Sequence, residues 1–107
     1  MGLFDFLKKP DINEGVRVFR ETKGAVLLDV RTDEEYKTSH IPESISIPLD
    51  RIMTAPNVLK DKNAPVFSYC LRGSRSRRAV SALRQMGYTN VINIGGIDAY
   101  RGEITRG

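Results

Sequence analysis

The sequence is poor in the residues that hold small secreted or metal-binding domains together. Cys70 is the single cysteine among 107 residues, which excludes an internal disulfide and a zinc site built on paired cysteines. No stretch approaches the roughly 20 apolar residues that a membrane-spanning helix needs. The nine glycines do not recur at every third position, which excludes a collagen-like chain. We expect a globular protein that needs no metal and no cofactor.

The first ten residues lack the order of a secretory signal peptide. Asp5 interrupts the short apolar stretch, and Lys8 and Lys9 follow that stretch instead of preceding it. Phe6 stands where a myristoylation motif requires Ser or Thr. We therefore expect a cytoplasmic protein without a membrane partner. A single domain should span residues 1–107, with residues 1–10 as an extension whose role the sequence does not indicate.

Negative charge is missing from a long central interval. No acidic residue lies between Asp61 and Asp98, and the net charge of the chain is +4. The interval holds five arginines, namely Arg72, Arg75, Arg77, Arg78 and Arg84. A basic patch can bind nucleic acid, but this one follows the cysteine directly and lacks the interleaved aromatic residues of a single-strand binder. The pattern favours a small anion as ligand and indicates no nucleic-acid partner.

Four short apolar runs have the character of β-strands and alternate with helical patterns. The runs cover residues 25–30, 45–47, 66–69 and 90–94. The first is almost unbroken, which is typical of a strand covered on both faces. Helices are predicted from Asp11, which with Glu14 forms a capping box, from a second box at Thr32 and Glu35, and over residues 74–86. Such alternation predicts an α/β fold with a central parallel sheet and helices on both faces.

The loop after the third run carries the strongest chemical signal. Cys70 is predicted to end a buried strand, at the sheet edge where open α/β sheets bind ligands. The amides of the following loop can surround an anion, and the positive end of the next helix adds to the attraction. These features stabilise a thiolate. Cys70 is therefore the predicted nucleophile, and the predicted substrate-binding residues are Leu71, Arg72, Gly73, Ser74, Arg75 and Ser76.

At these residues the chain resembles the rhodanese family of sulfurtransferases. The resemblance rests on Leu28-Asp29-Val30-Arg31, Glu35-Tyr36, His40-Ile41-Pro42, the pattern Cys-x-x-Gly-x-Arg-Ser from Cys70, and Gly95-Gly96. It extends from about Asp11 to near the end of the chain. It implies a rhodanese-like single domain with about five parallel strands. It also implies sulfane sulfur as the transferred group.

The length of the loop separates sulfur transfer from phosphate hydrolysis. Cysteine phosphatases of a related fold place arginine after five intervening residues, and Ser76 stands at that position here. Arg75 comes one residue earlier and closes a smaller ring. The resemblance implies that a ring of this size accommodates a single sulfur atom bound to the thiol. Arg72 and Arg75 are the expected side chains for attracting the donor anion, unless Arg75 is solvated or pairs with Asp29.

Three further polar residues are interpreted mainly as structural. Asp29 and Arg31 follow the first strand near the rim that holds Cys70, where buried charges must be paired. We expect them to form an ion pair in a second layer that braces the loop. His40 is the only histidine, and transfer of sulfur from thiosulfate to a thiolate removes no proton. We expect a turn residue hydrogen-bonded to the backbone.

The leading hypothesis is a thiosulfate sulfurtransferase that works through a Cys70 persulfide. A small anionic donor would supply sulfur, and cyanide, a low-molecular-weight thiol or an acceptor protein would receive it. A persulfide carrier for one partner protein is the first alternative. A non-catalytic binding module on the same scaffold is the second, and the presence of Cys70 counts against it. The donor, the acceptor and the oligomeric state are not determined by the sequence.

Overall fold

A computed structural model describes residues 10–107. Four parallel strands form one sheet in the order β2-β1-β3-β4. Their bounds are β1 (Val26–Asp29), β2 (Ile45–Ser46), β3 (Val66–Cys70) and β4 (Val91–Gly96). The resemblance implied about five strands, and that number was too high for residues 10–107. These residues supply only the four apolar runs seen in the sequence. Residues 1–9 of the expected extension lie outside the described part of the chain.

The helices begin close to the predicted positions. They are α1 (Ile12–Arg20), α2 (Asp33–Thr38) and α3 (Ser74–Gln85), with the 3₁₀ segments η2 (Leu49–Asn57) and η3 (Ile97–Ala99). Thr32 and Glu35 form the predicted capping box. Asp11 caps α1, but Glu14 does not reach back, because it pairs with Arg17 instead. In the described part of the chain, every helix is too short or too polar to cross a bilayer.

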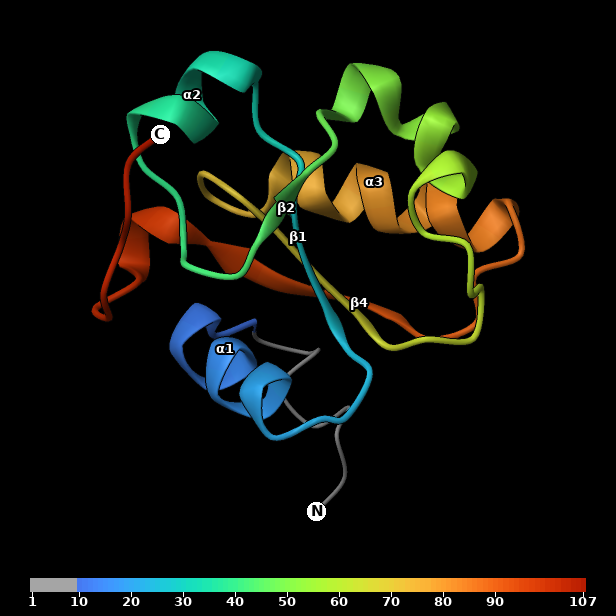
Figure 1. Cartoon of the computed structure of the whole chain (residues 1–107), viewed down its shortest axis with the longest axis horizontal. Helices are drawn as coiled ribbons and strands as arrows, with labels where there is room; N and C mark the ends of the chain where they lie inside the picture. Colours follow the sequence, from blue (N-terminus) through green and yellow to red (C-terminus); the bar gives the residue numbers. More distant parts are fainter. Residues whose placement is uncertain (1–9) are drawn as a thin grey trace.

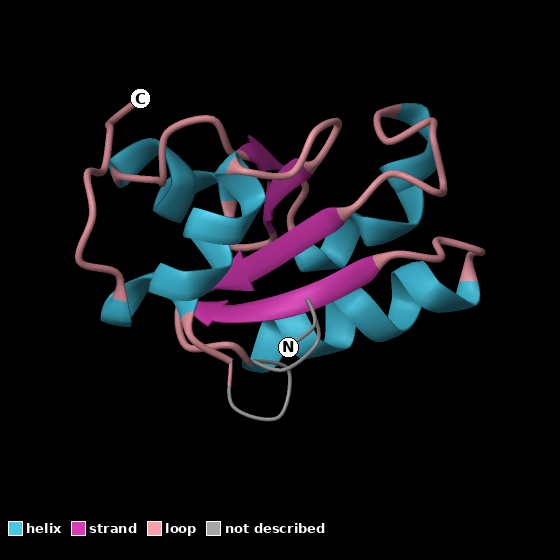
Figure 2. Cartoon of the chain, turned by 90° about the horizontal axis from the view of Figure 1, so that it is seen from below, coloured by secondary structure: helices cyan, strands magenta, loops and turns pink. Residues whose placement is uncertain are grey.

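The sheet is covered on both faces, as the unbroken apolar run of β1 predicted. Leu27 and Phe67 face a core built with α1, whereas Leu28 and Val66 face a core built with α3 and η2. Figure 1 shows α1 on one side of the sheet and α3 on the other. Figure 2 shows strands running in the same direction between helices. Neighbouring residues of one strand thus serve opposite cores, which is why the strand sequences do not alternate with polar residues.

Parallel pairing brings the carboxyl ends of the strands to one edge. Asp29 lies opposite Ser46 and Tyr69, and Cys70 lies opposite Gly96. The loop after Cys70 and the residues after β1 and β2 therefore share a rim. The topology places the predicted site where open parallel sheets bind ligands.

α1 packs against β4 through Gly15, a residue without a side chain. Gly15 is buried, and a Cβ atom added there would lie 2.4 Å from Cβ of Ile94. Glycine normally weakens a helix by about 1 kcal/mol relative to alanine. Here it lets the helix backbone approach the sheet closely.

We expect Gly15→Ala to destabilise the protein although it improves helix propensity. Cβ of Ile94 is fixed to the backbone and cannot rotate away, so α1 must shift and the core beneath it loses contacts. A loss of about 1–2 kcal/mol in the free energy of unfolding is expected from such overpacking. Urea unfolding measures it, with exposed Ser81→Ala in α3 as the control. Equal or greater stability of Gly15→Ala would contradict the packing.

Candidate active site

Cys70 lies at the end of β3 with two backbone amides directed at its sulfur. The amide of Gly73 donates to Sγ at 2.9 Å and that of Ser76 at 3.3 Å. Cys70 is only 1% exposed, so its sulfur lies inside the loop and not on the outer surface. Buried amides that converge on one atom stabilise negative charge there, because little water competes for them.

The sulfur takes the place of a helix cap. Gly73 is the N-cap residue of α3 and offers no side-chain acceptor, and the amide of Ser76 in the first turn of α3 bonds to Sγ instead. The first amides of a helix lack intrahelical partners and carry partial positive charge. The hydrogen bond from the Ser76 amide to Sγ therefore gives one amide of the helix end a partner, and it also places positive potential at Cys70.

Gly73 and Asn93 set the shape of the loop. Gly73 has φ of 110°, a conformation that residues with a side chain rarely adopt. Nδ2 of Asn93 donates to the Gly73 carbonyl at 3.1 Å, and Oδ1 of Asn93 accepts from the Gly95 amide at 3.0 Å. The sequence analysis treated Asn93 only as part of a strand. A polar amide in the middle of an apolar run was the available signal.

Ser76 anchors the start of α3 to the sheet. Its hydroxyl donates to Oγ of Ser68 at 2.8 Å, and both residues are fully buried. Ser76 was predicted to bind substrate. That stays a prediction; its side chain points into the protein, and its amide faces Cys70. The hydroxyl bond to β3 holds that amide in register with the sulfur.

Arg75 pairs with Glu35 and not with Asp29. The guanidinium bonds to both carboxylate oxygens, at 2.7 and 3.1 Å. Hydrogen bonding to Arg75 lowers the pKa of Glu35 from 4.5 to about 2. Glu35 also caps α2 by accepting from the amide and the hydroxyl of Thr32. The pair thus connects the loop after Cys70 to the start of α2.

The remaining loop residues are exposed. The side chain of Arg72 is 80% exposed, and its nearest carboxylate partner, that of Asp98, is 3.7 Å away. The carbonyl of Leu71 accepts from the Asp98 amide at 3.1 Å, and Ser74 opens α3 at the surface. Arg72 is therefore exposed and only loosely paired, so it is accessible to an incoming anion, whereas Arg75 is closely paired with Glu35.

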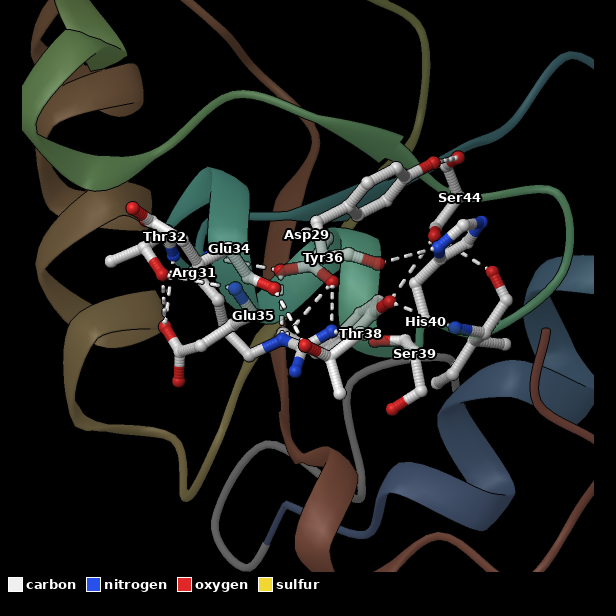
Figure 3. A network of polar contacts seen from close by, with 12 residues as sticks. Asp29, Arg31, Thr32, Glu34, Glu35, Tyr36, Thr38, Ser39, His40 and Ser44 are labelled. Carbon is white, nitrogen blue, oxygen red and sulfur yellow. Dashed lines mark hydrogen bonds and ion pairs between the residues drawn. The ribbon is translucent and has the colours of Figure 1, made fainter. Parts of the chain in front are cut away.

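The predicted charge pair is present next to the site (Figure 3). Arg31 bonds to Asp29 at 2.7 Å, and the two side chains are 5% and 0% exposed. Burial lowers the pKa of Arg31, but the hydrogen bonds and charge of Asp29 outweigh it, and the net shift is upward. Arg31 also donates to the carbonyl of Ser39 at 2.7 Å. The pair holds the segment after α2, with no direct hydrogen bond to the Cys70 loop among the described residues.

His40 is bound to the backbone, as expected of a turn residue. Nδ1 lies 2.9 Å from the carbonyl oxygen of Tyr36, and the ring stacks on Tyr36 with centroids 3.7 Å apart. Its amide donates to the carbonyl of Thr105 at 2.8 Å. None of these contacts involves the loop of Cys70. That His40 takes no part in catalysis stays a prediction.

Two cavities flank the loop. One of about 770 Å³ lies beside the Cys70 end of β4, where Arg72, Arg77 and Arg101 contribute to its wall. The other, of about 540 Å³, lies on the side of β1 and β2. It is lined by Val30, Thr32, Pro48, Leu49, Asp50, Arg75 and Arg78. In the sequence, Arg78 is only one of the five arginines that follow Cys70, and nothing local singles out Leu49 or Asp50. Only the packing of η2 against α3 brings them together.

The family follows from the whole chain and agrees with this geometry. The family model named Rhodanese-like domain matches residues 15–103. The chain belongs to this family. A rhodanese from E. coli, solved with anions, has 34% sequence identity and a TM-score of 0.72, and the match covers 78% of this chain and 99% of that one.

Two curated relatives illustrate that members of the family differ in length and in the function that their names state. Thiosulfate sulfurtransferase PspE of Escherichia coli (strain K12) is 43% identical over 74 residues, which cover 65% of this chain and 68% of the relative. The putative sulfur carrier protein YrkF of Bacillus subtilis (strain 168) is 33% identical over 89 residues, covering 83% of this chain and 43% of YrkF. Some relatives are longer still, and the match spans 22% of one of them. Sulfur transfer in general is the activity that this rhodanese-like domain has in common with its relatives named sulfurtransferase.

We expect replacement of one member of the Asp29–Arg31 pair to affect stability more than chemistry. Asp29→Asn leaves the guanidinium of Arg31 buried without its counter-charge, which costs about 3–5 kcal/mol in the free energy of unfolding. The double variant Asp29→Asn/Arg31→Gln should lose less than the sum of the two single variants. Urea unfolding measures the cost, and activity per folded molecule is measured alongside. A stable single variant without sulfur transfer would place the pair in the chemistry.

We expect the Glu35–Arg75 pair to make the free energy of unfolding depend on pH. Because the pKa of Glu35 is lowered on folding from 4.5 to about 2, its contribution is complete above the unfolded value and disappears as pH falls through the folded one. The difference in unfolding free energy between wild type and Glu35→Gln should therefore be constant near neutral pH and shrink between 4.5 and about 2. Exposed Glu34→Gln is the control. A difference that does not change with pH in this range would contradict the pairing.

Proposed function

We propose that this chain is an enzyme that transfers sulfane sulfur from an anionic donor such as thiosulfate through a persulfide on Cys70. The observation that carries the proposal is the convergence of the Gly73 and Ser76 amides on Sγ. The negative charge of a nucleophilic thiolate must be stabilised, and so must the negative charge of the persulfide formed from it. The relative PspE, named a thiosulfate sulfurtransferase, supports the choice of donor.

In the first half-reaction, the Cys70 thiolate attacks the outer sulfur of thiosulfate. A bond forms between Sγ and that sulfur, the sulfur–sulfur bond of the donor breaks, and sulfite leaves with the bonding electron pair. In the second half-reaction an acceptor such as cyanide attacks the outer sulfur and releases the Cys70 thiolate. Covalent catalysis of this kind divides one difficult transfer into two easier steps.

The loop residues divide into two roles under this proposal. Gly73 and Ser76 donate amides to the reacting sulfur, and exposed Arg72 attracts the donor anion. Arg75 holds the loop to α2 through Glu35. Steering of the donor therefore falls to Arg72 more than to Arg75.

The position of Ser76 argues against phosphate hydrolysis. A cysteine phosphatase needs a guanidinium at that place to hold phosphoryl oxygens in bidentate fashion. Ser76 supplies a hydroxyl that is turned inward and bonded to Ser68. The smaller ring closed by Arg75 supports a single transferred sulfur instead.

A persulfide carrier is the second candidate, and it uses the same first half-reaction. The likeness to the putative sulfur carrier protein YrkF favours it. A non-catalytic binding module would have no use for amides aimed at a thiol. The expectations of a cytoplasmic protein with no nucleic-acid or membrane partner stay predictions.

We expect Cys70→Ser to abolish thiosulfate:cyanide sulfur transfer while leaving the fold intact. Serine keeps the shape of the side chain but cannot form the persulfide. Incubation with thiosulfate should raise the mass of wild type by one sulfur atom and leave the variant unchanged, which mass spectrometry measures. Exposed Ser81→Ala should behave as wild type. A persulfide on wild type without cyanide turnover would favour the carrier, and activity in Cys70→Ser would refute the mechanism.

A further inference from the structure

The cavity of about 540 Å³ is lined by Val30, directly after β1, and by Arg75 in the segment that follows Cys70. Val30, which lines it, follows Asp29 at the end of β1, and Asp29 lies opposite Tyr69 in β3. Val30 therefore lies next to Cys70 across the sheet, at a strand spacing of about 4.8 Å. Both residues belong to the same core cluster. A molecule bound in this cavity lies next to the loop that holds Sγ.

The floor of the cavity is apolar and its volume suits a small molecule. Val30 and Pro48 are buried, and Leu49 is half-buried beside them. Small-ligand sites typically have volumes of about 300–1,000 Å³, with an apolar lining and a few polar groups that fix orientation. The short aliphatic part of a thiol can lie on this floor.

Two opposite charges on the rim have no ion-pair partner within residues 10–107. Arg75 is neutralised by Glu35, and Arg51, the neighbour of Asp50, is bonded to Asp33. Asp50 and Arg78 remain; both are exposed, and they form no ion pair with each other or with other described residues. The cavity thus presents one free carboxylate and one free guanidinium above an apolar floor.

We propose that this cavity binds the sulfur acceptor, and that the acceptor is a low-molecular-weight thiol of the amino-acid type, with one ammonium and one carboxylate group. Asp50 would pair with the ammonium and Arg78 with the carboxylate, while Thr32 offers a hydroxyl at the same rim. The proposal rests on the proposed function, since it concerns the second half-reaction. It assigns specificity to residues outside the loop of Cys70.

The reaction at this site balances without a further reactant. The acceptor thiol gives its proton to the outer sulfur of the anionic Cys70 persulfide, and the resulting acceptor thiolate attacks that sulfur, so that a new sulfur–sulfur bond forms. The bond between that sulfur and Sγ breaks, its electron pair returns to Cys70 as the thiolate, and the proton leaves with the acceptor persulfide. Nothing is oxidised or reduced overall, because the sulfane sulfur only changes its carrier.

The test compares four thiols on enzyme that already carries the persulfide. Protein is loaded with thiosulfate and desalted, and the rate of persulfide loss is measured with cysteine, cysteamine, 3-mercaptopropionate and 2-mercaptoethanol. These probes carry both charges, the ammonium alone, the carboxylate alone and neither. Each rate for a variant is divided by the wild-type rate with the same thiol, which cancels the intrinsic reactivity of that thiol.

Arg78→Ala should lower the rates with cysteine and 3-mercaptopropionate by about two- to fivefold, the size of one exposed ion pair. It should leave cysteamine and 2-mercaptoethanol unchanged. Asp50→Asn should lower the rates with cysteine and cysteamine only. Arg77→Ala is the matched control, because Arg77 is the adjacent arginine of α3 and lines the other cavity. It should change none of the four ratios.

Three results overturn the proposal. The first is a variant effect that is equal for all four thiols, and the second is an effect of Arg77→Ala that matches that of Arg78→Ala. Four unchanged ratios for both Arg78→Ala and Asp50→Asn also overturn it. Failure of the underlying function looks different, because wild-type protein would then acquire no sulfur from thiosulfate at all. Persulfide formation with normal cyanide turnover but no charge selectivity refutes the acceptor site alone.

Discussion

The site depends on the meeting of a helix end with one sulfur atom. The thiol of Cys70 accepts from the amides of Gly73 and Ser76, so the positive end of α3 is directed at the atom that is proposed to carry the transferred sulfur. Because Gly73 supplies no capping side chain, the sulfur of Cys70 accepts a hydrogen bond from an amide of the helix end that would otherwise lack a partner. A negative charge on this sulfur is stabilised by groups already in position, without reorganisation of water.

The surrounding structure holds this contact from three directions. The hydroxyl bond between Ser76 and Ser68 ties α3 to β3 below the sulfur. Asn93 holds the loop from β4 through the Gly73 carbonyl. The Glu35–Arg75 pair joins the loop to α2, whose other end is held by Arg31 through Ser39. A loop with many such ties keeps its amides aligned with the sulfur.

The arginines near this edge of the sheet have two different environments, one paired with a carboxylate and one exposed. Arg75 is neutralised by Glu35 and has a structural task, whereas Arg72 is exposed with only a loose contact of 3.7 Å to Asp98, and Arg78 forms no ion pair among the described residues. The sequence shows only a basic cluster after the cysteine. The arginines have different roles because the packing of α2, η2 and α3 decides which carboxylates lie near each of them.

The amino-acid sequence alone was sufficient for the order of strands and helices, the Thr32 cap, Cys70 at the end of a buried strand and the pairing of Asp29 with Arg31. These features are local, since each depends on apolar periodicity, capping residues or charges two positions apart. The partner of Arg75, the inward turn of Ser76, the support from Asn93 and the cavity with Asp50 and Arg78 needed the tertiary structure. Each depends on contacts between different helices, strands or loops, which are decided by how the helices pack on the sheet. Of these residues only Asn93, a polar side chain within an apolar run, had a local signal in the sequence.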